Sequence, residues 1–223
     1  MSFQKTKTNA ALGEEVHQHL LNLGLETPTT ELLNVDNKDK IEKIESHMTE
    51  ICKILGLDLT DDSLIETPKR VAKMMVLEQN WGLLPENFPK NTTILNKMKT
   101  DEMITVGDIP VMSICEHHMI VISGSAVVSY LPKEKVIGLS KLARIVEYFS
   151  RRPQVQERLT SQIYHALSYL LETEDVAVGI NAKHYCMISR GVETPNSWTQ
   201  TTKLGGAFKL DRGTKAEFLR LVK

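Results

Sequence analysis

The sequence contains few cysteines and lacks the apolar segments of secreted or membrane proteins. Its three cysteines, Cys52, Cys115 and Cys186, are odd in number and too few for a disulfide scaffold, so they fit a reducing compartment. Residues 1–10 are polar and have no signal-peptide core, and no apolar run is long enough to span a bilayer. We therefore expect a cytoplasmic protein without membrane contacts.

The chain also lacks an excess of charge of either sign. Lys and Arg number 27 and Asp and Glu number 28, for a formal net charge of -1. Proteins that bind nucleic acid in bulk carry a basic surface that offsets the phosphates, so this balance argues against DNA or RNA as a partner. Hydrophobic residues make up 41% of the chain, which is enough for a substantial core.

The first part of the chain has helical periodicity. Apolar residues recur at helical spacing over residues 13–25 and 38–55, and Gly24 and Gly56 are typical helix ends. Pro68 after Thr67 predicts the start of another helix. Cys52 falls within the second of these helices, where nothing around it resembles a ligand set, so we interpret it as a packing residue.

The second part of the chain mixes strands and helices. The segments rich in Val and Ile, which favour strands, are residues 103–109, 120–130 and 176–188. Ser123-Gly124 indicates a hairpin turn. The remaining elements that we expect are helices over residues 140–149, 153–171 and 217–222, and a short strand near residues 199–204. This order predicts an α+β fold with an antiparallel sheet.

The densest chemical pattern is Cys115-Glu116-His117-His118. Cys115 and His118 have the spacing of a turn, from which a thiolate and an imidazole can reach one metal ion. This pair of ligands favours zinc over magnesium or calcium. Taken alone, the tetrapeptide is equally compatible with a polar turn that contains a buried structural cysteine.

A second pattern, His184-Tyr185-Cys186, supplies a third ligand. If this segment is a strand, His184 and Cys186 point to the same side, and Cys186 joins Cys115 and His118. Structural zinc sites usually have four protein ligands, whereas catalytic sites keep one position for water. We therefore expect a catalytic Zn²⁺ on these three residues. The titratable groups left as candidate catalytic residues are Glu116, His117 and His184.

This ligand set predicts a type of reaction. Zinc lowers the pKa of a bound water to about 7, and a neighbouring imidazole can move protons at neutral pH. The residues thus indicate zinc-assisted addition of water to a carbon electrophile. A nucleobase deaminase would be an alternative zinc hydrolase, but that class uses a His-x-Glu motif and a Pro-Cys-x-x-Cys motif, and the sequence contains neither.

The order of several motifs resembles GTP cyclohydrolase I from about residue 48 to the C-terminus. In chain order, the motifs are ETPKRVAKM (66–74), CEHH (115–118), IGLSKLARIV (137–146), RPQVQERLT (152–160), HYC (184–186) and RGV (190–192). The resemblance implies an enzyme that converts GTP and water to 7,8-dihydroneopterin triphosphate and formate. That reaction is the first step of folate, pterin or 7-deazaguanine biosynthesis.

For the chemical step, the resemblance implies that zinc is held by Cys115, His118 and Cys186. Water activated by the metal adds to C8 of guanine, while His184 protonates N7. The imidazole ring then opens through a formyl intermediate, and the formyl group leaves as formate. His117 assists the opening of the ribose ring before the dihydropterin ring closes.

For substrate binding, the resemblance implies that Gln156 and Glu157 read the guanine edge. The Glu157 carboxylate can accept from N1–H and from the exocyclic amine, which are adjacent donors. The residues expected against the triphosphate are Arg70, Lys73, Ser140, Lys141, Arg144 and Arg190. From charge pattern alone, Arg70 and Lys73 would lie on a solvated helix face.

The resemblance also implies a fold and an assembly. The fold is the T-fold, with an N-terminal helical region over residues 1–100 and a catalytic domain over residues 101–223. The assembly is a toroidal decamer with sites at subunit boundaries, which would let Arg70 reach the phosphates. A non-catalytic T-fold protein that binds a purine or pterin is the alternative. Such a protein should have lost a zinc ligand or His184, and this sequence retains them.

Overall fold

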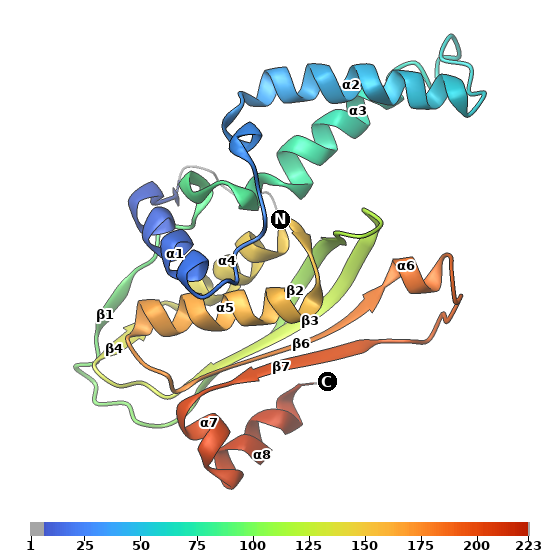
Figure 1. Ribbon diagram of the computed structural model, residues 1–223. Helices are drawn as coiled ribbons and strands as arrows, with labels where there is room; N and C mark the ends of the chain where they lie inside the picture. Colours follow the sequence, from blue (N-terminus) through green and yellow to red (C-terminus); the bar gives the residue numbers. More distant parts are fainter. Residues whose placement is uncertain (1–6, 223) are drawn as a thin grey trace.

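A five-stranded sheet forms the centre of the protein (Figure 1). The computed structural model describes residues 7–222. In spatial order, the strands are β5 (Pro153–Gln154), β2 (Ile104–Cys115), β3 (Val121–Tyr130), β6 (Val176–His184) and β7 (Thr199–Leu204). The long strands pair antiparallel, and the short β5 runs parallel to β2. The expected α+β class with an antiparallel sheet is therefore confirmed.

Helices cover both faces of this sheet. They are α4 (Leu139–Ser150) and α5 (Gln156–Leu171) on one face, and α7 (Gly206–Leu210) and α8 (Arg212–Leu221) on the other. In β6, Val178 belongs to the cluster under α4 and α5, whereas Ala177 packs against Phe208 and Phe218. Because successive side chains of a strand point to opposite faces, a strand covered on both sides needs a continuous apolar run. The run VAVGI at residues 176–180 is buried throughout.

The buried face of α4 follows from helical periodicity. Leu142, Ile145, Val146 and Phe149 recur at intervals of one helical turn, and all four are fully buried. Burying a side chain of this kind contributes about 2 kcal/mol relative to leaving it in water. The helix is therefore held firmly on the sheet beside β2.

The N-terminal part consists of a helix on the body and a helical arm. The first helix, α1 (Ala10–Asn22), packs on α5 and buries Leu20 in the main core. The next two helices, α2 (Asn37–Ile54) and α3 (Thr67–Lys73), pack on each other and extend away from the sheet as an arm (Figure 1). Cys52 is buried on α2, as expected of a packing residue.

Short elements connect these parts. They are η2 (Glu31–Asn34), the π-helical η3 (Met74–Gln79), η4 (Trp81–Leu83), η5 (Pro85–Asn87), β1 (Thr93–Leu95), β4 (Lys135–Ile137) and α6 (Tyr185–Ile188). β1 and β4 pair antiparallel as a separate two-stranded sheet just before α4. None of the helices between residues 7 and 222 has the length and apolar character that crossing a membrane requires.

The hairpin turn expected at Ser123-Gly124 is wrong, because both residues lie inside β3. The connection between β2 and β3 is instead formed by residues 116–120. Gly124 has a different purpose, since a Cβ added there would lie 2.1 Å from the carbonyl oxygen of Asn181 in β6. The glycine permits the close approach of two strands, which the sequence pattern does not distinguish from a turn.

Several further boundaries differ from the expectation. The strand expected over residues 103–109 extends to Cys115, and the helix expected over residues 217–222 begins at Arg212. The strand expected over residues 176–188 ends at His184, where its partner β3 also runs out, because His184 pairs with Ile122 near the start of β3. Beyond that point the chain turns into the short helix α6. The helix expected from residue 153 begins at Gln156, because Pro153 and Gln154 pair with the end of β2.

Candidate metal centre

The turn between β2 and β3 carries the CEHH tetrapeptide. The backbone N–H of Met119 donates to the carbonyl of Cys115 (2.8 Å), and the N–H of Cys115 donates to the carbonyl of Ile120 (2.8 Å). Met119 takes a left-handed conformation, with φ of 55°, which closes the turn tightly. Inside it, Nδ1 of His117 lies 3.8 Å and Nδ1 of His118 lies 4.0 Å from Sγ of Cys115.

Cys186 reaches the same place from α6. The ligand atoms of Cys115, His118 and Cys186 all lie within 4.8 Å of one another. Among residues 7–222, this is the only group of three or more His, Cys, Asp or Glu side chains that is close enough to hold a metal ion. The sequence suggested that His184 and Cys186 share one side of a strand. This is wrong, because the helix α6 begins at Tyr185, between them. Both nevertheless face this end of the sheet.

The surroundings of the Cys186 thiol favour a cation. Burial raises the pKa of Cys186, and the adjacent Cys115 thiol raises it further. Two thiolates cannot lie side by side without a positive charge between them, which a metal ion supplies. Two sulfur ligands and one imidazole form a soft donor set of the kind that zinc prefers, and three protein ligands leave a position for water.

The orientation of His184 is set by Gln156, which is buried at the start of α5. The Gln156 amide nitrogen donates to the carbonyls of Ile180 (3.1 Å) and Thr199 (2.9 Å). Its Oε1 therefore accepts from Nε2 of His184 (2.8 Å), so that Nδ1 is the acceptor nitrogen of the neutral ring. Burial lowers the pKa of His184, and the carboxylate of Glu157 partly opposes this effect.

Two more of the expected site residues lie at this end of the sheet. Arg190 follows α6, and its guanidinium donates to Nε2 of His118 (2.9 Å). Glu116 directs Oε2 toward Arg158 on α5, while its Oε1 lies 3.9 Å from Nε2 of His117. The end of β2, the starts of α5 and α6 and the loop after α6 thus bring these groups together. The expected site residues gathered here are Cys115, Glu116, His117, His118, Gln156, Glu157, His184, Cys186 and Arg190.

Three of the residues expected at the triphosphate lie elsewhere. Ser140, Lys141 and Arg144 belong to the first turns of α4. This helix starts just after Ile137, whose N–H donates to the hydroxyl of Tyr130, the last residue of β3 (3.3 Å). The metal turn, residues 115–120 between β2 and β3, is at the other end of β3, so the start of α4 and the metal turn lie near opposite ends of a ten-residue strand.

The start of α4 is rich in positive charge. Burial lowers the pKa of Lys141, and the charges of Arg144, Lys7 and Lys90 lower it further. Gly138, at the N-cap, provides no side-chain cap for the free backbone N–H groups of the first turn. Uncapped N–H groups beside several cations suit an anion such as phosphate.

The last two expected ligands, Arg70 and Lys73, are exposed on α3 in the arm. Arg70 lies 3.7 Å from Glu66, one helical turn earlier, in a surface ion pair. Three groups of expected site residues therefore occupy three places in one chain. Sequence reasoning missed Arg158, Lys7 and Lys90, because no spacing rule connects residues so far apart along the chain.

Comparison with known proteins identifies the family. Residues 44–223 match the family model of GTP cyclohydrolase I. The chain is 56% identical over 210 residues to GTP cyclohydrolase 1 of Yersinia pseudotuberculosis, which covers 94% of this chain and 95% of the relative. It is 55% identical over 218 residues to GTP cyclohydrolase 1 of Erwinia tasmaniensis, with 96% and 99% covered. The match extends over the metal cluster and nearly the whole chain, and the chain therefore belongs to the GTP cyclohydrolase I family.

Proposed function

We propose that this protein converts GTP and water to 7,8-dihydroneopterin triphosphate and formate, with Zn²⁺ held by Cys115, His118 and Cys186. The observation that carries the proposal is the Cys–His–Cys cluster, in a chain of the GTP cyclohydrolase I family. When bound, zinc supplies a polarised water whose pKa is lowered to about 7. The protein residues around it bind and orient the nucleotide and move protons.

His184 is the proposed proton donor to N7 of guanine. Its lowered pKa keeps it largely neutral at pH 7, so that it can take up a proton and return it during turnover. The hydrogen bond to Gln156 holds the proton on Nε2 and leaves Nδ1 as the exchanging nitrogen. His117, which is next to the ligands, is proposed to assist the opening of the ribose ring.

Glu157 is the proposed reader of the guanine edge. Its carboxylate is exposed beside His184 and can accept from N1–H and from the exocyclic amine. The Gln156 amide nitrogen is already engaged by carbonyls of β6 and of Thr199, so any contact of Gln156 with guanine has to use its oxygen. A role of Gln156 at the guanine edge stays a prediction.

The triphosphate is proposed to bind Ser140, Lys141, Arg144 and Arg190, with Arg70 and Lys73 completing the set. One chain cannot place all of these on one nucleotide, because the start of α4 is about the length of β3 away from the metal turn. We therefore propose that neighbouring subunits contribute the α4 residues and the arm residues to each site.

Two features of the chain support such an assembly. In the described chain, β7 is the last strand of the sheet, so it offers a free edge to a further strand. The arm exposes large apolar side chains, with Ile54 at 83% and Leu55 at 69% of their full exposure. We propose that residues 101–223 form a T-fold unit, that residues 1–100 form a helical region, and that the subunits assemble as a toroidal decamer in the cytoplasm.

The experiment is to incubate the purified protein with GTP while near-ultraviolet pterin absorbance and formate are recorded. We expect both products, their loss after treatment with a chelator, and their return with Zn²⁺. Zinc bound at one ion per subunit without turnover would instead support a non-catalytic purine- or pterin-binding protein. Turnover that survives complete removal of metal would overturn the zinc site.

A further inference from the structure

The metal turn is tied to α5 through one arginine that the expected roles leave unassigned. Arg158 donates to Oε2 of Glu116, to the carbonyl of Pro153 (3.1 Å) and to Oε1 of Gln154 (3.2 Å). The backbone N–H of Glu116 also donates to the carbonyl of Gln154 (3.1 Å). Glu116 is therefore held at its backbone and at its side chain by the same short segment.

The ion pair between Arg158 and Glu116 is shielded from solvent. The side chain of Arg158 is 16% exposed and that of Glu116 is 29% exposed. A charged pair in such a setting, with further hydrogen bonds to the guanidinium, is stronger and better defined than a surface pair. It holds Glu116 in one rotamer, and that residue lies between Cys115 and the two histidines.

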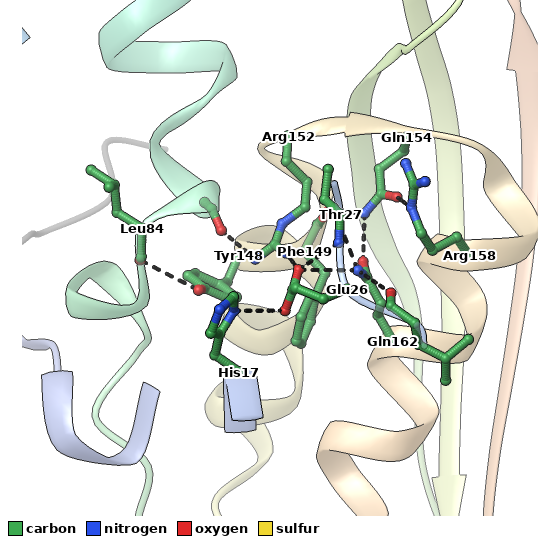
Figure 2. A network of polar contacts seen from close by, with 12 residues as sticks. His17, Glu26, Thr27, Leu84, Tyr148, Phe149, Arg152, Gln154, Arg158 and Gln162 are labelled. Atoms are coloured by element: carbon green, nitrogen blue, oxygen red, sulfur yellow. Dashed lines mark hydrogen bonds and ion pairs between the residues drawn. The ribbon is translucent and has the colours of Figure 1, made fainter. Parts of the chain in front are cut away.

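Arg158 is itself held in place by a chain of oriented amides (Figure 2). The Gln154 amide nitrogen donates to the carbonyl of Phe149 (2.8 Å) and to Oε1 of Gln162 (2.7 Å), so its oxygen has to face Arg158. The Gln162 nitrogen then donates to the carbonyl of Leu25 (2.8 Å) in the segment after α1. Each amide has one orientation that satisfies these partners.

The far end of this series of hydrogen-bonded amides is anchored by a buried ion pair. Glu26 accepts from Arg152 (2.6 Å) through Oε1 and from Nδ1 of His17 (3.1 Å) through Oε2 (Figure 2). Arg152 is 1% exposed, so its charge depends on Glu26 for compensation. The support for the metal turn is thus continuous with the packing of α1 on the body.

We propose that Arg158 is a positioning residue for the metal centre. It fixes the Glu116 carboxylate and thereby the turn that carries Cys115 and His118, and Gln154 and Gln162 hold its guanidinium in register. Glu116 then acts by orientation rather than by proton transfer, since one oxygen is held by Arg158 and the other faces His117. This inference rests on the proposed zinc site.

The planar guanidinium matters as well as its charge. Three acceptors, Glu116, Pro153 and Gln154, surround it in a fan that a lysine ammonium on a single stem cannot match. Arg158→Lys keeps the charge and loses the fork, whereas Arg158→Met loses both. The two variants therefore separate attraction from geometry.

The test compares Arg158→Met, Arg158→Lys and Glu116→Gln with the control Arg220→Met, which removes one positive charge from an exposed site on α8. The first readout is the rate at which zinc passes to a chromogenic chelator. The second is the visible absorption of the Co²⁺-loaded protein, which reports ligand geometry without turnover. The third is the division of any loss between kcat and KM for GTP.

For Arg158→Met we expect zinc release to be about 10-fold to 100-fold faster and kcat to fall by a similar factor, which is typical for groups that orient metal ligands. KM should change by less than about threefold, since Arg158 is not proposed to touch GTP. Arg158→Lys should lie between this variant and the unmodified protein. Arg220→Met should behave as the unmodified protein.

Glu116→Gln should shift zinc release in the same direction as Arg158→Met but by less, because its amide oxygen can still accept from Arg158 without the negative charge. The double variant should add little to Arg158→Met, because both changes act on one contact. If Arg158→Met does not fold, Glu116→Gln carries the test from the more exposed side of the pair. Unchanged zinc release in a folded variant would overturn the positioning role and leave the proposed function standing. An unmodified protein that binds no zinc would overturn the proposed function and this inference together.

Discussion

The two ends of β3 are built in opposite ways. At the metal turn, charged and polar groups have partners within the chain: Glu116 has Arg158, His184 has Gln156, and Arg190 contacts His118. At the start of α4, burial lowers the pKa of Lys141, and the like charges of Arg144, Lys7 and Lys90 lower it further. The first end is organised before any ligand arrives, whereas the second holds positive charge that an anion would offset.

Under the proposed function, this contrast separates the place of the chemical step from the place where the phosphates bind. A metal centre needs fixed ligands, because an error of a fraction of an ångström weakens coordination, and its supports therefore come from the same chain. A phosphate cradle needs net positive charge more than precise geometry. In the proposed assembly, another subunit can therefore complete it.

The largest effect is expected from Cys186→Ser. Two remaining ligands should not retain zinc, so metal content and formate production should both fall to background. The matched control is Cys52→Ser, which changes a buried cysteine on α2 far from the cluster. Metal analysis and formate release provide the measurement, and full activity of Cys186→Ser would contradict the metal site.

A smaller loss is expected from Arg144→Ala at the other end of β3. Removal of a charge-assisted contact with phosphate should weaken GTP binding about 10-fold to 100-fold. Binding of guanosine, which has no phosphate, should hardly change, and zinc content should stay at its normal level. Calorimetric titration with GTP and guanosine measures the difference, and equal losses for both ligands would argue against a phosphate role.

Mixing these two variants tests whether the two ends belong to one site. After subunit exchange, some sites take their metal turn from an Arg144→Ala subunit and their α4 from a Cys186→Ser subunit. Such sites should be active, because each part comes from the subunit in which it is unaltered. Random pairing of equal amounts makes such sites about a quarter of the total, so about a quarter of normal activity should return. No recovery after demonstrated exchange would mean that each chain supplies both ends of its own site.

The smallest effect is expected on stability at the basic end. Lys90→Gln removes one of the charges that lower the pKa of Lys141 and should raise the free energy of unfolding by less than about 1 kcal/mol, because salt screens these exposed groups. The gain should shrink at high ionic strength. Urea unfolding at two salt concentrations measures it, with Lys215→Gln on α8 as the control. A salt-independent change would show that repulsion is not the cause.

The candidate metal ligands were predictable because their signals are local. Cys115 and His118 lie within one tetrapeptide, and Cys186 comes soon after the end of a β-rich segment. The structure places their ligand atoms within 4.8 Å, as a shared metal site requires. The α+β class was predictable for the same reason, since helical and strand periodicities are properties of short windows.

Boundaries that depend on pairing were not predictable. Gly124 suggested a turn, but its lack of a Cβ serves the approach of β6, and this is known only once β3 and β6 are in register. The helix at Tyr185 begins where the pairing of β6 with β3 ends, at Ile122. The helix α5 begins later than predicted because Gln154 pairs with β2. In each case a partner distant in sequence overrode the local preference.

The residue patterns of the chain are enough to predict the fold class, the three candidate metal ligands and the titratable groups beside them, and the order of the motifs predicts the family. Only the folded chain shows that the metal turn and the start of α4 lie at opposite ends of β3, and that Arg158 contacts Glu116. Spacing along the chain encodes turns and buried faces. The ends that meet in space are set by strand order, register and the packing of helices across the sheet.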